Sequence, residues 1–268
     1  MTMQTVGLVS YVLLTFVIAW GLWAPLRHRA LDPSSMSFQL AILPGAFAPA
    51  VAASIVRGLI TKEGFALAEF IPKLEAWPVY LTGWLLPLVI ALGTYFAVRV
   101  SRWAVYPREI RPLRSRIGLL AKLPIVALVM APFQFGEEFG WRVFFQARLF
   151  PEAPLIAAIV TGLFWAAWHW PLIRLGYGYP TERGKGLAAF TLWSVLLSVF
   201  LGWVYTRTGD VWGVSLAHMA GNTIGASSLA ALLPGDRKRH LVDYEGVLSS
   251  AILGVVCLAL ILTGGVSW

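Results

Sequence analysis

Long apolar runs without a charge constrain this chain more than any other feature of its sequence. A helix that crosses the roughly 30 Å hydrocarbon layer of a bilayer needs about 20 apolar residues. Seven uncharged runs reach that length, at residues 1–26, 33–56, 76–98, 153–173, 186–206, 211–235 and 246–268. An eighth run, 123–136, is shorter and ends at two consecutive glutamates. Because lipid offers the backbone no hydrogen-bond partners, runs this apolar predict helices.

We therefore expect an all-α fold, a polytopic transmembrane helical bundle with about eight spans that form one integral-membrane domain over residues 1–268. The composition agrees, since 13% of the residues are charged, against roughly 25% in soluble domains. The first run has no basic leader before it and no small-residue cleavage site after it, which favours a retained span over a signal peptide. The single cysteine, Cys257, excludes an intramolecular disulfide and a thiolate cluster.

The net charge of +8 indicates membrane lipids as partners and not nucleic acid, because the lysines and arginines fall mainly between the apolar runs. The richest group, called the basic cluster below, comprises Arg99, Arg102, Arg108, Arg111, Arg114, Arg116 and Lys122. The positive-inside rule places this cluster on the cytoplasmic side of the cell membrane and the amino terminus outside. The two consecutive glutamates, at the far end of their run, would then approach the outer surface.

Few ionisable residues lie at membrane depth, where such residues usually face a cavity or a partner. Glu137 and Glu138 follow a helical stretch and are followed by further apolar residues, so the helix should continue through both charges. Adjacent side chains on a helix point about 100° apart, whereas Glu138 and Arg142, at i and i+4, share a face and can pair. This pattern neutralises one carboxylate and leaves Glu137 free.

Two of the four histidines stand inside uncharged runs. His218 and Asn222, at i and i+4, place an imidazole and an amide on one helix face. His169 lies near the end of another run. His28 and His240 lie in charged loops, where solvation is the simpler interpretation. One carboxylate, two imidazoles and an amide from three helices can thus converge on a buried, water-filled site.

Two kinds of chemistry suit this set of groups. In amide hydrolysis, a carboxylate or an imidazole deprotonates water, and an imidazole with an amide donates hydrogen bonds to the developing oxyanion. Two neutral imidazoles and a glutamate also match the ligands of a catalytic zinc ion, which would be His169, His218 and Glu137. The HExxH signature of many zinc proteases is absent from the sequence, so the zinc hypothesis has no motif of its own.

At these residues the chain resembles the CPBP family of intramembrane proteases, also called the Abi or CAAX-protease family, which includes Rce1-like enzymes. The sequence EEFGWR at 137–142 fits the EExxxR motif of the family, and His169 fits the end of its FxxxH motif. The stretch from His218 to Asn222 fits HxxxN. The resemblance covers roughly residues 123–229, which we predict to be the catalytic core.

The resemblance implies a role for each matching residue. Water activation falls to Glu137 and His169, oxyanion stabilisation to His218 and Asn222, and support of the site to Glu138 and Arg142. The family includes proteins called metalloproteases whose need for metal is disputed, so we assign no cofactor and keep a divalent metal such as zinc as an open alternative.

The chain departs from the family pattern at two positions. Trp165 stands where the FxxxH motif usually begins with phenylalanine, and Val143 follows the EExxxR motif where one bacterial branch often has glycine. Tryptophan in place of phenylalanine keeps an aromatic wall. We therefore take Trp165, together with Trp141 inside the first motif, as candidates for the substrate pocket.

The implied function is that of an intramembrane endopeptidase, a hydrolase that cleaves a membrane-associated or lipidated (CAAX-type) peptide or protein. Two hypotheses from other classes stay open. One is a proton-coupled membrane transporter in which the same carboxylate and histidines form a relay, and it predicts matching interrupted spans in both halves of the chain. No polar or broken span is evident in the first half. The other is a non-catalytic bacteriocin-immunity or partner-binding membrane protein.

Overall fold

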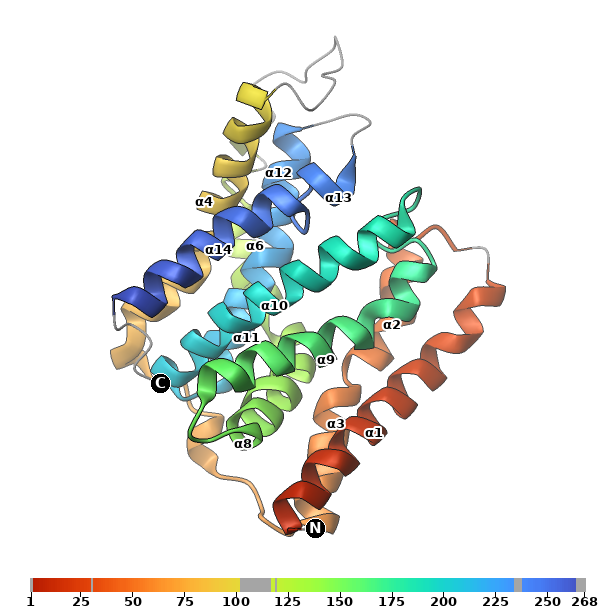
Figure 1. The fold of residues 1–268 in the computed structure, drawn as a ribbon, viewed down its shortest axis with the longest axis vertical. Coiled ribbons are helices and arrows are strands. Elements are labelled where there is room, and N and C mark those ends of the chain that lie inside the picture. The colour runs from red at the N-terminus through yellow and green to blue at the C-terminus, as the bar shows by residue number, and fades with distance from the viewer. Residues whose placement is uncertain (1, 30, 102–116, 119, 234–237, 264–268) are drawn as a thin grey trace.

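The computed structural model describes residues 2–29, 31–101, 117–118, 120–233 and 238–263. Every regular element in these residues is a helix, which confirms the predicted all-α bundle (Figure 1). Most of the basic cluster, between positions 102 and 116, lies outside the described residues.

Continuous α-helices and shorter turns alternate along the chain. The α-helices are α1 (Met3–Trp23), α2 (Met36–Ala46), α3 (Ala48–Ile55), α4 (Trp77–Ser101), α6 (Leu123–Met130), α7 (Phe135–Glu138), α8 (Ala147–Leu149), α9 (Pro154–Arg174), α10 (Arg183–Thr208), α11 (Val211–Ala220), α12 (Ala226–Leu232), α13 (Arg239–Val242) and α14 (Val247–Leu262). Wide π-helical turns at Val56–Ile60, Phe139–Gln146 and Gly221–Gly225 follow α3, α7 and α11. Tight 3-10 turns occupy Ala24–His28, Leu67–Glu69, Leu74–Ala76 and Ala131–Gln134.

Six helical stretches of the described chain are long and apolar enough to cross a membrane. They are Met3–His28, Met36–Ile60, Leu67–Ser101, Pro154–Arg174, Arg183–Thr208 and Arg239–Leu262. The other two expected spans are also helical, but the stretches 123–149 and 211–232 each contain a π-helical turn. These two interrupted stretches carry the glutamate pair and the pair His218 and Asn222, whereas His169 lies in the continuous helix α9.

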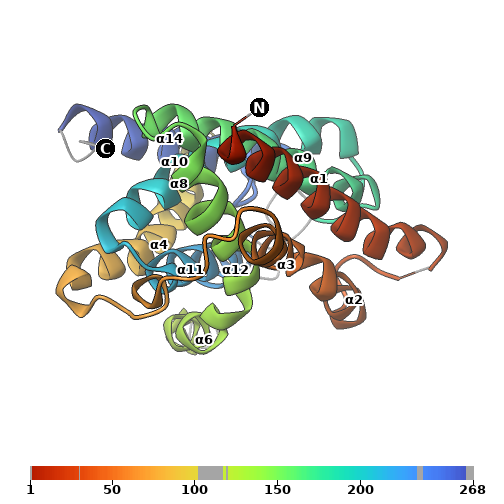
Figure 2. The ribbon, with the colours of Figure 1, turned by 90° about the horizontal axis from the view of Figure 1, so that it is seen from below.

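The helices form two layers. Figure 2 shows α1, α9, α10 and α14 in one layer and α2, α3, α11, α12 and α4 in the other, with α6 outside the second. The contacts agree, because α10 packs against α9 and α14, and α11 packs against α4 and α6. The segment 135–146 contacts α3, α9, α10 and α11. The glutamates therefore lie between the layers, at the centre of the bundle.

The first helix illustrates how the sequence divides a span between core and lipid. Its buried residues recur at every fourth position, at Gly7, Tyr11, Thr15, Ala19 and Trp23. This spacing keeps them on one face of the helix. On other faces, Leu13 and Val17 are 60% and 69% exposed. Large apolar side chains exposed along a whole helix suit contact with lipid tails.

Small residues bring α9 and α10 close together. A Cβ atom at Gly162 would lie 2.6 Å from the Cα atom of Val195, so a larger residue would push the helices apart. Across the same contact, the Ser198 hydroxyl donates a hydrogen bond of 2.8 Å to the carbonyl oxygen of Ala158. This packing fixes the position of α9, which carries two of the candidate site residues.

A helix break in the first half of the chain contradicts the expectation that no span there is broken. The second span is interrupted at Phe47, between α2 and α3, with Pro44 and Pro49 on either side. Proline removes a backbone donor and clashes with the preceding turn, which explains the break. A Cβ atom at Gly136 would lie 2.8 Å from the Phe47 ring. The broken region around Phe47 therefore packs closely against Gly136, the residue before Glu137.

The segment 61–76 covers one end of the bundle. Phe70 stacks on Phe139 with ring centroids 5.4 Å apart, and its carbonyl oxygen accepts a hydrogen bond of 2.7 Å from the Trp212 indole. The carboxylate of Asp210 accepts a hydrogen bond of 3.1 Å from the backbone N–H of Lys73. These bonds hold the segment over the aromatic residues that flank the glutamates.

Candidate active site

The glutamate pair ends α7, and the helix widens into a π-helical turn directly after it. Glu137 is 8% exposed and Glu138 is fully buried. Turns of this kind are frequent at functional sites. The helical stretch continues to Leu149, so the glutamates lie midway along it. The glutamates are therefore inside the bundle and not at the end of a helical stretch.

Gly140 seats the glutamate-bearing turn on α3. A Cβ atom at this position would lie 2.3 Å from the Cβ atom of Pro49 and 2.5 Å from its carbonyl carbon. No side chain fits at such distances, because the nearest atoms belong to a rigid ring and to backbone. The absence of a side chain at Gly140 thus decides how closely the turn approaches α3.

Glu138 is the centre of a buried ion-pair cluster. Its Oε1 atom accepts a hydrogen bond of 3.1 Å from Nη1 of Arg142, and it lies 2.5 Å from Nδ1 of His218. The predicted i, i+4 pair of Glu138 and Arg142 is therefore present. Charges inside a membrane protein are tolerated when they are paired in this way.

Glu137 is not free, which differs from the expectation. Its Oε2 atom accepts a hydrogen bond of 2.9 Å from the indole N–H of Trp165. Its other oxygen, Oε1, has no hydrogen-bond partner among the described residues. One carboxylate oxygen is thus fixed by the protein and the second remains for a ligand.

Trp165 connects the candidate residues to one another. The Arg142 guanidinium lies over its ring at 4.6 Å, and the His218 ring makes an edge-to-face contact with centroids 5.1 Å apart. Its carbonyl oxygen lies 3.0 Å from Nδ1 of His169. Trp165 therefore contacts both candidate histidines. It also contacts two of the three charged residues of the EExxxR motif, Glu137 and Arg142.

The surroundings of His169 define its tautomer. A carbonyl oxygen can only accept a hydrogen bond, so Nδ1 of His169 carries the proton that is donated to Trp165. In the neutral ring Nε2 then keeps its lone pair. The edge-to-face contacts with Trp168 and Phe190, at centroid distances of 4.6 and 5.0 Å, hold the ring in place. The imidazole is therefore oriented as a proton acceptor at Nε2.

Asn222 stands apart from the ion-pair cluster. It lies in the π-helical turn that follows α11, is exposed, and makes no side-chain hydrogen bond within the described chain. It lines a cavity of about 500 Å³, together with residues of α2, Gln134 and Glu245. The structure thus places Asn222 on a cavity wall, one helical turn beyond the buried His218.

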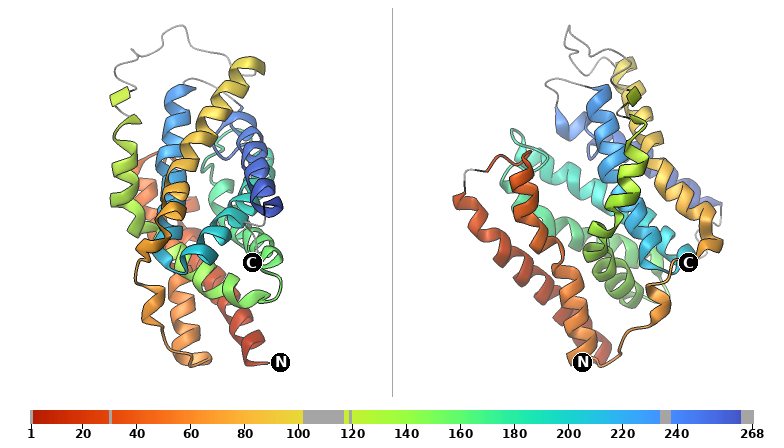
Figure 3. Two further views of the ribbon diagram at one scale, coloured as in Figure 1. Left: turned by 90° about the vertical axis from the view of Figure 1, so that its left-hand side faces the viewer. Right: turned by 180° about the vertical axis from the view of Figure 1, so that it is seen from behind.

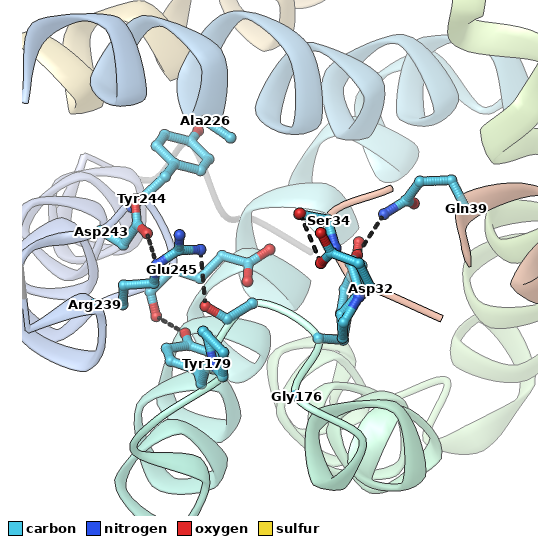
Figure 4. A pocket seen from close by; sticks show the side chains of 14 residues that line it. Asp32, Ser34, Gln39, Gly176, Tyr179, Ala226, Arg239, Asp243, Tyr244 and Glu245 are labelled. Atoms are coloured by element: carbon cyan, nitrogen blue, oxygen red, sulfur yellow. Dashed lines mark hydrogen bonds and ion pairs between the residues drawn. The ribbon is translucent and has the colours of Figure 1, made fainter. Parts of the chain in front are cut away.

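A second cavity, of about 310 Å³, adjoins the first (Figure 4). The two share the lining residues Gln39, Tyr177, Ala226 and Glu245. The second cavity is otherwise lined by two loop segments, at 32–34 and 176–180, and by Arg239 of α13 with Asp243 and Tyr244 after it. Seen from behind, α1 and α2 diverge from α4, α6 and α12 towards this end of the bundle (Figure 3). The two cavities together lead from the loops to Asn222.

Trp141 occupies the core. Its indole is fully buried, with ring contacts to Tyr11 at 5.6 Å and to Trp168 at 6.1 Å. Neither Trp141 nor Trp165 lines the two cavities described above. Their assignment to a substrate pocket stays a prediction.

Three polar groups were missed or misplaced by sequence reasoning. His240 is 8% exposed, and its Nδ1 lies 2.6 Å from Oε2 of Glu182, so its assignment to a solvated loop is wrong. Hydrogen bonds from Lys185 and His240 hold the pKa of Glu182 below its usual value. Gln134 and Glu245 were not considered, although an amide inside an apolar run and an acid at the start of another were visible signals.

The residues expected to bind zinc are not arranged as a ligand set. In the part of the chain that the structure describes, no group of three His, Cys, Asp or Glu side chains is placed to hold a metal ion. Trp165 holds Glu137 through Oε2, and Glu138 holds His218 through Nδ1, so Oε1 of Glu137 and Nε2 of His218 are not engaged by these contacts. The zinc alternative stays a prediction, and we route no chemical step through a metal.

Comparisons with known proteins agree with the predicted resemblance. The family model described as Type II CAAX prenyl endopeptidase Rce1-like matches residues 118–224. The CAAX prenyl protease 2 of Methanococcus maripaludis is 27% identical over 185 residues, a match that covers 64% of this chain and 65% of that protein. The match thus spans slightly less than two thirds of this relative. The predicted resemblance is confirmed, and the family match includes all three motifs.

Proposed function

We propose that this chain, whose residues 118–224 match the Rce1-like family model, is an intramembrane endopeptidase of the cell membrane. Its catalytic core is the segment 123–229, and its substrate is a membrane-associated or lipidated peptide or protein of the CAAX type. The observation that carries this proposal is the convergence of Glu137, His169 and His218 on Trp165 inside an apolar bundle.

In the proposed mechanism, Glu137 and His169 activate the attacking water. Glu137 offers Oε1 to the water while Trp165 holds Oε2, and His169 offers Nε2. The water oxygen bonds to the peptide carbonyl carbon, and the proton that it loses passes to the carboxylate or the imidazole. The C–N bond then breaks, the leaving nitrogen takes up a proton, and the products are a carboxylic acid and an amine.

His218 and Asn222 stabilise the oxyanion in this proposal. Glu138 accepts a hydrogen bond from Nδ1 of His218, so in this proposal the ring acts in its doubly protonated form, in which Nε2 donates to the oxyanion. Asn222 supplies an amide N–H from the cavity wall. Donors of this kind typically contribute about 100-fold to 1000-fold to kcat when they are held in place before the reaction. Glu138 and Arg142 act as positioning residues.

We propose that the cavities open on the cytoplasmic side. The segments that line them lie at the end of the bundle where α4 ends and leads into the basic cluster (Figure 1). The end of α9, at Arg174, and the start of α10, at Arg183, lie at this end as well. A cysteine placed at the exposed Ser34 should react with a membrane-impermeant thiol reagent only from the cytoplasmic side. A cysteine at the exposed Glu152, at the other end, should react only from outside.

Peptide cleavage by the purified full chain in lipid nanodiscs tests the function. Lipidated and unlipidated peptides of one sequence are incubated with the wild type and with Glu137→Gln, His169→Ala and His218→Ala, and the products are identified by mass spectrometry. We expect each variant to lose cleavage and the control Glu152→Gln, an exposed carboxylate far from the site, to keep it. Unchanged cleavage by the three variants would contradict the proposal.

A further inference from the structure

Gln134 is a buried amide that the mechanism above does not use. Its side chain is 7% exposed and has no hydrogen-bond partner among the described residues. It ends the tight turn Ala131–Gln134, three residues before Glu137, and it lines the larger cavity. A buried amide without a partner costs stability. Gln134 is therefore placed where a bound ligand, and not the protein, can satisfy its hydrogen bonds.

Glu245 faces the same cavity from the opposite layer and also lacks a partner. Its carboxylate makes no hydrogen bond or ion pair within the described chain. Its backbone is held in place, since the Tyr179 hydroxyl donates a hydrogen bond of 2.7 Å to its carbonyl oxygen. The adjacent Tyr244 packs on Trp193, with ring centroids 4.8 Å apart. The carboxylate is thus positioned by its neighbours and left without a cation.

At Gly225, the turn that carries Asn222 packs closely against Tyr244, the residue before Glu245. A Cβ atom at Gly225 would lie 2.1 Å from the Tyr244 ring, so only glycine lets the ring pack against the turn Gly221–Gly225. Glu245 and Asn222 therefore belong to one packed unit, and both line the larger cavity.

The acidic character extends to the mouth of the cavities. The Asp243 carboxylate lies 3.9 Å from Arg239, whereas the Asp32 carboxylate accepts hydrogen bonds only from Ser34 among the described residues. Those hydrogen bonds hold the pKa of Asp32 below its usual value, so it is charged at neutral pH. Figure 4 shows the Glu245 side chain extending into the space between the loops of Arg239 and Asp32. Among the described residues that line the smaller cavity, three are acidic (Asp32, Asp243 and Glu245) and one is basic (Arg239).

The remaining wall of the larger cavity is apolar. It is formed mainly by Met36, Leu40, Leu43, Met130, Phe133 and Met219. An apolar wall with a few fixed polar groups is typical of a binding site. Its volume of about 500 Å³ is enough for a few residues of a peptide.

We propose that this cavity is a substrate subsite that binds an apolar peptide segment with one basic side chain. Gln134 hydrogen-bonds to the main chain of the peptide, because an amide donates and accepts as a peptide group does. Glu245 pairs with the lysine or arginine side chain. This inference rests on the proposed function, since Asn222 on the same wall connects the subsite to the reaction.

Cleavage of matched peptides tests the role of Glu245. The peptides are identical apolar substrates in which one residue, varied in position, is lysine or its uncharged isostere norleucine. We expect the wild type to prefer the lysine peptide by about tenfold in kcat/KM, as for a hydrogen bond to a charged group. Glu245→Gln should lose this preference by becoming slower on the lysine peptide alone. Glu245→Asp should keep the preference for the lysine peptide. Glu245→Lys should instead prefer a peptide with glutamate at the varied position. The control Glu152→Gln should match the wild type on every peptide.

Gln134 has a test that separates binding from a structural role. We expect Gln134→Met to raise KM for every peptide by about fivefold or more, with little change in kcat, because it removes main-chain hydrogen bonds. The same variant should unfold at a higher temperature, since it removes an unpartnered buried amide. A structural role for Gln134 predicts the opposite, a lower unfolding temperature and an unchanged KM.

Binding to an inactive variant distinguishes failure of the subsite from failure of the proposed function. Fluorescent lysine and norleucine peptides are titrated onto Glu137→Gln and onto the double variant with Glu245→Gln. Tighter binding of the lysine peptide that depends on Glu245 supports the subsite, even where the wild type cleaves neither peptide. Equal binding of both peptides, or a lysine preference that survives Glu245→Gln, would overturn it.

Discussion

Nδ1 of His218 lies 2.5 Å from Oε1 of Glu138, although the two residues are 80 positions apart in the chain. The same oxygen accepts a hydrogen bond from Arg142. One carboxylate on α7 therefore orients an imidazole on α11 and neutralises a guanidinium on its own helix. This arrangement explains why two adjacent glutamates serve different purposes. Glu138 is committed to the protein, and Glu137 keeps one oxygen for a ligand.

The first prediction concerns the stability that Glu138 provides. Glu138→Ala leaves the fully buried Arg142 without an acidic partner, and breaking such a pair costs about 3–5 kcal/mol. We expect a loss of that size in the free energy of unfolding, measured by denaturant titration in detergent. Glu63→Ala is the matched control, because its pair with Arg148 is partly exposed and should contribute less than about 1 kcal/mol. Equal losses in both variants would contradict the buried cluster.

The second prediction concerns the contact between Gly140 and Pro49. Gly140→Ala forces the glutamate-bearing turn away from α3, because the added Cβ atom has no space. Overpacking of this kind costs about 1–3 kcal/mol, and we expect activity to fall together with thermal stability. In Gly21→Ala the added atom meets nothing within 4 Å, so this helical control should be stabilised by roughly 0.5–1 kcal/mol. The opposite order of stabilities would show that the turn tolerates the shift.

The fold was predictable because apolar runs and helix spacing are local properties of the sequence. Each uncharged run of sufficient length corresponds to a helical stretch, and the pair of Glu138 with Arg142 follows from one helical turn. The helix also continues through Glu137 and Glu138, as the apolar residues that follow them predicted. A count of apolar residues alone stops at Gly136, whereas the helix continues with Glu138 paired inside the bundle.

The contacts between helices were not predictable. Trp165 was taken as an aromatic wall, and its hydrogen bond to Glu137 depends on how α9 packs against α7. His240 was assigned to solvent because charged neighbours surround it in sequence, whereas in the fold it reaches Glu182 on another segment. Gln134 was overlooked since nothing in its own run shows that it faces a cavity. In each case the partner is distant in sequence.

The third prediction concerns metal. Because no three His, Cys, Asp or Glu side chains of the described residues are placed to hold a metal ion together, we expect no stoichiometric zinc in the purified protein. Elemental analysis should find less than one equivalent. Prolonged incubation with a chelator should leave peptide cleavage unchanged, while a zinc endopeptidase assayed in parallel should lose its activity. Loss of cleavage with the chelator and its return with zinc would contradict the arrangement of donors described here.

The fourth prediction concerns the indole N–H of Trp165. Trp165→Phe removes the donor that holds Oε2 of Glu137 and keeps an aromatic ring beside Arg142 and His218. A hydrogen bond to a charged group contributes about 1.5–3 kcal/mol, which corresponds to a fall in kcat of about tenfold to a hundredfold if it orients the catalytic carboxylate. KM should change little, because the residue does not line either cavity.

Trp170→Phe is the matched control for this variant. It makes the same substitution on the same helix, but its side chain is 40% exposed on the outside of the bundle. We expect its kcat to equal that of the wild type and the unfolding temperatures of both variants to stay close to the wild-type value. A kcat for Trp165→Phe equal to that of Trp170→Phe would show that Glu137 needs no indole donor. If kcat of Trp165→Phe falls in proportion to a decrease in its unfolding temperature, the role of Trp165 is packing alone.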